Sequence, residues 1–365
     1  MTMGITALGA VVSFAMFSIA ARWLGPEEFG RFSAWFSAAS FLAVFAGARQ
    51  ETLIVRTWAE YTTRGQHGLA RGAVLFGLGI TLAGSLLVAS LFFVGSELLN
   101  HETAITVAAS LFIVSQALSH FGTNSSHNIV GYVIGQGSAD VTWRLLVLIF
   151  IVTPLLPGDW HSASSLLLLA ATSQFLVFAA QIGSVYRYSP AIVRQAPTEF
   201  RSKEWRDRGL RMWAAAIVEA SSQYLDVVIV QHSGQSGGRR RLLRRHTCRE
   251  HLRAHVECHG QLCRRRIAPL YFAGKRAELI ALSRSISLVV LVLVVGGLLV
   301  VILFGRLLLS VFGPVFAEQM PALVILTHRD SRYGLSGPAP IFLHETGHEG
   351  VYARIVGWGF LAASR

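Results

Sequence analysis

Three polar side chains stand at helical spacing inside one strongly apolar stretch of the chain, Leu210–Val230. They are Glu219, Gln223 and Asp226, separated by four and three residues, so a helix carries them on one face. Carboxylates inside a membrane are costly and mark ion or substrate pathways. The spacing predicts a cation or proton site, or a polar lining for a hydrophilic cargo. The alternative is a bundle-facing group that pairs with an arginine for packing.

A second polar group follows the apolar stretch Phe32–Ala48 and contains Arg49, Glu51 and Arg56. A guanidinium binds phosphate oxygens through two parallel hydrogen bonds. A pyrophosphate head group is therefore a candidate ligand. Ordinary anchoring by basic residues on the cytoplasmic side of a membrane explains the same residues equally simply.

Two glutamines form a weaker candidate face. Gln174 and Gln181 lie seven residues apart in the apolar stretch Ala163–Val185, so a helix presents both amides on one side.

One short motif resembles a zinc-protease helix. His344 and His348, with Glu345 between them, match H-E-x-x-H, in which both histidines bind zinc and the glutamate acts as base. Gly347 lies inside the motif and no third ligand follows it, so a polar turn between two spans is the favoured interpretation and a membrane zinc protease a remote alternative.

No P-loop or nucleophile-elbow pattern occurs. We therefore predict neither an enzyme nor a cofactor or metal.

Long apolar stretches recur along almost the whole chain. Charged residues make up only 14% of the sequence, against about 25% in soluble domains. A membrane-spanning helix needs about 20 mostly apolar residues, and no soluble domain of this size can bury so many of them. The runs are continuous rather than alternating, which argues against a membrane β-barrel. The stretches are Gly4–Ala21, Phe32–Ala48, Ala73–Gly95, Thr106–Leu118, Thr142–Leu156, Ala163–Val185, Leu210–Val230 and Ile286–Phe312.

The connections between these stretches alternate in charge. Basic residues crowd the connections at 49–71 and 187–209, whereas those near 97–102 and 157–162 have no Lys or Arg. Basic connections stay cytoplasmic, which places the N-terminus inside. The fold class predicted is all-α, a polytopic helical membrane protein of two six-helix bundles. The domains expected are a six-helix bundle at 1–186, a cytoplasmic linker at 187–209 and a second bundle at 210–365.

The second bundle is interrupted by an unusual segment, 232–266. It holds ten Arg and two Glu, all three Cys and five of the 13 His, and supplies +8 of the net charge of +12. Three interpretations compete: a basic arm for nucleic acid, a zinc site, and a frame error in the gene that replaces a missing span. Zinc fits poorly because the His and Cys pairs lie in the wrong order and too close together. We favour the frame error and expect no nucleic acid partner. The apolar rhythm at the C-terminus also predicts that the second bundle is incomplete.

Four motifs, in order along the chain, resemble bacterial polysaccharide flippases of the Wzx type. The motifs are the LGPEEFG turn at Leu24–Gly30, the QETL…R stretch at Gln50–Arg56, SQYLDVVIV at Ser222–Val230 and the region Leu335–Arg354 with its TGHE. These flippases belong to the multidrug/oligosaccharidyl-lipid/polysaccharide exporter superfamily.

The resemblance implies two six-helix bundles with alternating access in the bacterial inner membrane. It implies a lipid-linked cargo, an undecaprenyl-pyrophosphate oligosaccharide, and partners among the polysaccharide polymerase and glycosyltransferase machinery. A cation-coupled multidrug exporter of the same superfamily is the alternative.

Overall fold

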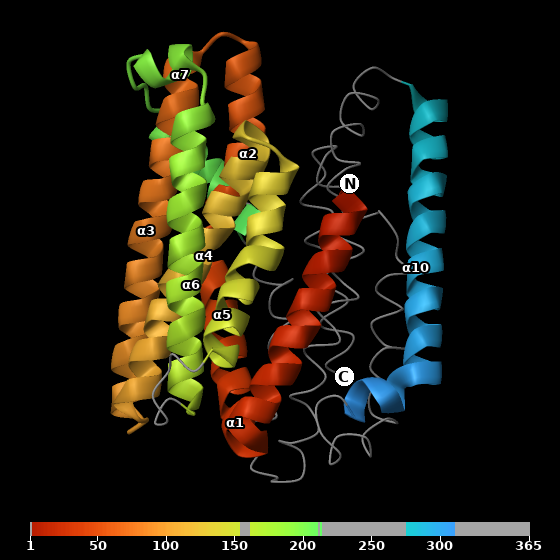
Figure 1. Ribbon diagram of the computed structural model, residues 1–365. Coiled ribbons are helices and arrows are strands. Elements are labelled where there is room, and N and C mark those ends of the chain that lie inside the picture. The colour runs from red at the N-terminus through yellow and green to blue at the C-terminus, as the bar shows by residue number, and fades with distance from the viewer. Residues whose placement is uncertain (1, 154–160, 211, 214–274, 311–365) are drawn as a thin grey trace, which may run out of the picture. The chain divides into compact units, whose positions relative to one another are not determined.

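The computed structural model describes residues 2–153, 161–210, 212–213 and 275–310 of the chain. It divides into two compact units, one made of Met1–Met16 with Trp23–Ser233 and the other of Phe17–Arg22 with Gly234–Arg365. The predicted domain boundaries remain predictions. The helices are α1 (Thr2–Gly47), α2 (Gln50–Thr63), α3 (His67–Leu98), α4 (Thr103–Ile129), η1 (Val133–Thr142), α5 (Trp143–Val152), α6 (Ala163–Tyr188), α7 (Ala191–Gln195) and α10 (Arg276–Ser310), drawn in Figure 1.

The described helices confirm a multi-pass helical membrane protein. Six continuous helical segments among the described residues are long and apolar enough to cross a bilayer, and one of them, Val133–Val152, consists of η1 and α5 together. Two predicted boundaries were wrong: the short span at 106–118 is the full helix α4, and the span at 142–156 begins earlier, at Val133. The residues expected to form a connection at 49–71 are largely helical, because α2 occupies Gln50–Thr63. The prediction of two six-helix bundles involves residues outside the described ranges and stays a prediction.

The LGPEEFG motif is a sharp turn inside α1 (Figure 1). Gly25 adopts φ 75° and ψ 172°, a conformation that suits glycine, and Pro26 starts the second arm with its φ already set. The Glu28 carboxylate accepts a hydrogen bond from the backbone N–H of Ala163, 2.7 Å away, at the first residue of α6. Arg31 pairs with Glu102, just before α4. The motif thus ties three helix ends together.

Helix α4 is the centre of the first unit and packs against α2, α3, η1 and α6. In its neighbour α3, small residues such as Gly72, Gly77 and Ala89 are buried, while most of the leucines are exposed. Small residues allow helix backbones to approach closely inside a membrane, and large apolar side chains suit contact with lipid. The exposed leucines of α3 are Leu75, Leu82, Leu86, Leu87, Leu91 and Leu98.

Candidate functional site

A buried network of polar side chains joins α4, α6 and η1. Its centre is Gln181, only 1% exposed. The Gln181 amide nitrogen lies 3.2 Å from Thr123 Oγ1 on α4, and 2.7 Å from Ser138 Oγ and 3.2 Å from the Gly135 carbonyl, both on η1. One side chain therefore links three helices. We call Gln181 and these partners, with the residues in the next paragraph, the polar seam.

The seam continues two turns along α6 at Gln174. Its amide nitrogen donates to Gln116 Oε1 on α4, and its own oxygen accepts from Ser115 Oγ at 3.1 Å. Gln116 Nε2 in turn lies 2.8 Å from Nε2 of His120, the next turn of α4. The two glutamines do share a face, as their spacing predicts, and that face looks toward α4. Amides, hydroxyls and an imidazole thus form a chain of hydrogen bonds inside an apolar bundle.

An ionisable pair that the sequence did not single out as a site lies at the edge of the seam. Asp140 on η1 accepts from Gln136 Nε2 at 3.0 Å, and Arg144 Nη1 donates to the Asp140 carbonyl at 2.8 Å. The segment is a π-helix, a form that is rare and frequent at functional sites. Gly9, on the first arm of α1, allows close contact, since a Cβ there would lie 2.8 Å from Asp140 Cβ. Asp140 was missed because the span was predicted to start at residue 142.

The predicted cluster at 49–56 lies at a break between α1 and α2. Ala48 and Arg49 both have positive φ, 44° and 55°, which non-glycine residues adopt only where the surroundings hold them. Arg49 Nη1 lies 3.9 Å from Glu51 Oε1, so the structure brings these two candidates together. Burial raises the pKa of the Glu51 carboxyl, while Arg49 opposes that rise. Arg56 lies on α2, and its side chain is outside the described residues.

The remaining predicted site residues cannot be placed. Glu219, Gln223 and Asp226 lie outside the described residues, as do His344, His348 and the whole of 232–266. Among the residues that the structure describes, no three His, Cys, Asp or Glu side chains gather as a metal site does.

The described side chains form a membrane-embedded network of neutral hydrogen-bond donors and acceptors, with two pairs of ionisable residues beside it. The break carries Arg49 beside Glu51, and η1 carries Asp140 beside Arg144. Such a network can hold polar groups or a cation inside the bilayer.

Comparison with known proteins finds a similar fold but no family to which the chain can be assigned. Neither a known protein family nor any curated protein sequence matches the chain. One solved structure that does match is described as the inward-facing conformation of a multidrug resistance MATE family transporter of the MOP superfamily. The TM-score is 0.67 at 10% identity, over 97% of this chain and 87% of that one. At this identity the likeness is one of fold. It extends over almost the whole chain.

Proposed function

We propose that the chain is a membrane transporter that works by alternating access and moves an undecaprenyl-pyrophosphate-linked oligosaccharide across the bacterial inner membrane. The single observation that carries transport is the fold: 97% of the chain matches a solved transporter with a TM-score of 0.67. The four motifs that resemble Wzx-type flippases support the cargo class. The polymerase and glycosyltransferase machinery would then supply and use this cargo.

Arg49 supports recognition of an anionic head group. It follows the last residue of a predicted span, and its side chain is 31% exposed, so it can reach a ligand without leaving the bundle. Arg49 has a left-handed backbone conformation, which an arginine keeps only when surrounding contacts stabilise it. A guanidinium binds phosphate oxygens through two parallel hydrogen bonds, so a pyrophosphate group suits this position.

A cation-coupled multidrug exporter is the second candidate. The observation that favours it is Asp140, a carboxylate within the span Val133–Val152 that accepts a hydrogen bond from Gln136. A carboxylate at this depth can exchange a proton or hold a monovalent cation during transport.

The test is transport by the purified full chain in liposomes. Fluorescent undecaprenyl-pyrophosphate oligosaccharide is placed in one leaflet, and its arrival in the other is followed by quenching with a membrane-impermeant reagent. We expect flipping that Arg49→Ala reduces by about tenfold or more and that Arg49→Lys partly restores, because a desolvated charge–phosphate contact contributes about 1.5–3 kcal/mol. Arg64→Ala is the matched control, since Arg64 is a more exposed arginine near the other end of α2, paired with Glu60.

Two results would overturn the proposal. One is wild-type protein that leaves the lipid-linked sugar in its original leaflet while exporting cationic dyes, which would favour the multidrug alternative. The other is equal flipping by the Arg49→Ala and Arg64→Ala variants, which would remove Arg49 from recognition of the head group.

A further inference from the structure

The polar linker expected at 187–209 is packed against the first bundle. Arg71 on α3 donates through Nη1 to the carbonyls of Arg194 and Ala196, at 2.7 and 2.9 Å. The backbone N–H of Glu199 donates to the Gly68 carbonyl at 3.2 Å. These bonds hold the backbone of the linker where α7 ends. We refer to residues 191–213, of which 211 is outside the described residues, as the strap.

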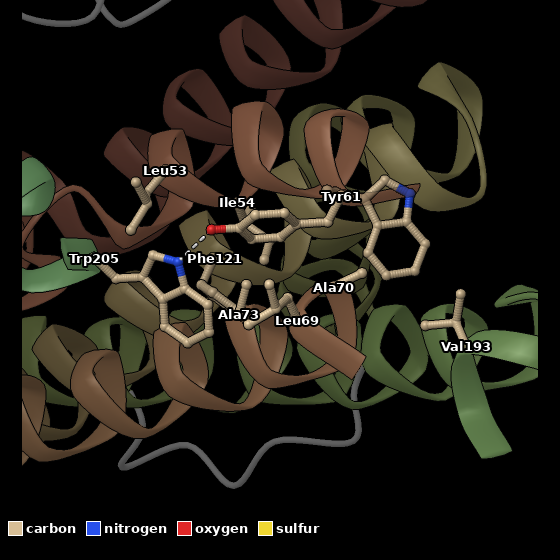
Figure 2. Packing of buried hydrophobic residues seen from close by; sticks show 10 residues of the cluster. Leu53, Ile54, Tyr61, Leu69, Ala70, Ala73, Phe121, Val193 and Trp205 are labelled. Atoms are coloured by element: carbon tan, nitrogen blue, oxygen red, sulfur yellow. Dashed lines mark hydrogen bonds between the residues drawn. The ribbon is translucent and has the colours of Figure 1, made fainter. Parts of the chain in front are cut away.

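A tryptophan of the strap fills the core of this end of the bundle. Trp205 is 0% exposed, although exposed charged residues flank it, and its Nε1 donates to Tyr61 Oη on α2 at 2.9 Å (Figure 2). Its ring also lies against Phe76 of α3. A buried tryptophan with its N–H paired contributes more packing area than any other side chain can. The cluster around it includes Leu53, Ile54, Trp58, Tyr61, Leu69, Ala70, Ala73, Phe121 and Val193, most of which Figure 2 labels.

Two glycines of α3 let the strap backbone come this close. A Cβ at Gly72 would stand 1.8 Å from the Glu199 carbonyl oxygen, and one at Gly68 would stand 2.4 Å from the Pro197 carbonyl oxygen. Both distances are far inside van der Waals contact. Gly79, seven residues after Gly72 on the same helix, has no atom near such a Cβ. The close approach therefore depends on particular glycines.

The strap also contacts the break between α1 and α2. Trp213 Nε1 donates to the Phe45 carbonyl at 3.1 Å, and the two rings meet edge to face at 6.0 Å. A Cβ at Gly209 would stand 2.6 Å from the side-chain nitrogen of Gln50, a buried residue directly after Arg49. Trp213 thus binds Phe45 on α1, before the break, and Trp205 binds Tyr61 on α2, after the break. The two tryptophans hold both arms of the bend.

We infer that residues 191–213 form a rigid strap that fixes the angle between α1 and α2, and so positions Arg49, rather than a flexible tether between bundles. The left-handed backbone at Ala48 and Arg49 does not form by its own preference. Contacts of Trp213, Gly209 and Trp205 on either side supply the constraint. This inference stands whichever cargo the protein carries.

The first experiment measures docking of the strap by trypsin cleavage of the purified full chain in nanodiscs. Wild-type protein, Gly72→Ala and Gly79→Ala are compared, and mass spectrometry follows the cuts after Arg194, Arg201, Lys203, Arg206 and Arg208. A protease needs a locally opened chain, so cleavage follows the open population. We expect Gly72→Ala to raise these rates about tenfold or more, and Gly79→Ala to leave them unchanged.

The second experiment measures the angle. Nitroxide labels are placed at Glu27→Cys and Thr63→Cys, both exposed, in a background with the three native cysteines replaced by serine. Double electron–electron resonance then reports the distance from the start of the second arm of α1 to the end of α2. We expect one narrow distribution in the parent and the Gly79→Ala variant, and a broadened or shifted one with Gly72→Ala.

Two outcomes would overturn the inference. Rapid cleavage of the wild-type strap, equal to that of Gly72→Ala, would show a flexible tether. A released strap with an unchanged distance distribution would show that the break holds its own angle. If Gly72→Ala aggregates, Arg71→Ala replaces it, because it removes the side chain that binds both carbonyls without adding a clash, and Arg64→Ala is then the control.

Discussion

The long-range side-chain hydrogen bonds and ion pairs at the two ends of the first helical unit differ in how deeply they are buried. At the end that carries the Gly25 turn, the ties are charged and partly exposed: Glu28, Arg31 and Glu102 have side-chain exposures of 31%, 38% and 53%. The end that carries the strap also has partly exposed charged contacts, those of Arg71 with the strap backbone and of Arg208 with Glu60. In addition it has a fully buried tie between Trp205 and Tyr61, at most 1% exposed. Exposed ion pairs contribute little and weaken in salt, whereas burial of aromatic rings contributes several kcal/mol.

The difference suggests where the unit is stiff. An exposed ion pair such as that of Arg31 with Glu102 can be lost at little cost, because water replaces the contact. An end closed by a buried tryptophan over close-packed glycines does not tolerate displacement in this way, because any displacement exposes apolar surface. Arg49 lies at the end that carries the strap, since Gly209 of the strap contacts Gln50 directly after it. The stiff end is therefore the one that positions Arg49.

The largest effect expected is from Trp205→Ala. It removes a fully buried ring and the hydrogen bond to Tyr61, and should lower the free energy of unfolding by about 3–5 kcal/mol. The measurement is the midpoint of thermal unfolding of the full chain in detergent. Ile192→Ala is the control, since Ile192 is 60% exposed on the same segment. Equal loss in both variants would contradict the picture of a packed strap end.

The next effect tests the polar seam, between the two ends. Gln181→Leu keeps the volume but leaves Thr123 Oγ1 and the Gly135 carbonyl without the partner that the amide supplied. We expect a loss of about 1–3 kcal/mol, the cost of an unsatisfied buried polar group. Thr172→Val, at an exposed residue on the same helix, is the control. Thermal unfolding no lower than in that control would mean that the seam is not a set of required hydrogen bonds.

The sequence predicted which connections lie at the same end of the bundle better than it predicted the contacts that join them. The contact of Arg31 with Glu102 joins two connections expected on one side of the membrane, and that of Arg71 with Arg194 joins two expected on the other. Apolar stretches of spanning length force this alternation, so a single sequence suffices to find it. Which end faces the cytoplasm stays a prediction. The charged turn at Leu24–Gly30 was visible because glycine and proline mark a sharp turn locally.

The strap end was not predictable in the same way. Trp205 lies among charged residues, and only the fold brings it to Tyr61, 144 positions earlier. The break at Ala48–Arg49 carries no local signal, because neither alanine nor arginine prefers a left-handed backbone. The partners of Gln181 on α4 were missed because Ser and Thr are common in spans and pair with the backbone as often as with each other. Tertiary contacts decide these features.

A smaller effect is expected from Glu28→Ala at the Gly25 turn. The carboxylate accepts from the Ala163 N–H at the start of α6, where unpaired backbone donors and the helix dipole both favour a negative charge. Its loss should lower the free energy of unfolding by about 0.5–2 kcal/mol. Glu27→Ala, the exposed neighbour, is the matched control in the same unfolding assay. A loss as large as that of Trp205→Ala would make the two ends equivalent.

The smallest effect expected is from Glu102→Gln, which keeps the shape of the side chain and removes the charge that faces Arg31. Both side chains are more than one-third exposed, so the loss should be at most about 1 kcal/mol and should shrink as salt rises from about 0.05 to 0.5 M. The salt response is the sharper test, because it separates a charge effect from a packing effect. Trp205→Ala should show the reverse, a loss that salt does not diminish, since burial of apolar surface is not screened. Unfolding midpoints of both variants across one salt series therefore compare the two ends directly. A salt-independent loss with Glu102→Gln would mean that Arg31 and Glu102 are buried against other groups, and that the two ends are tied in the same way.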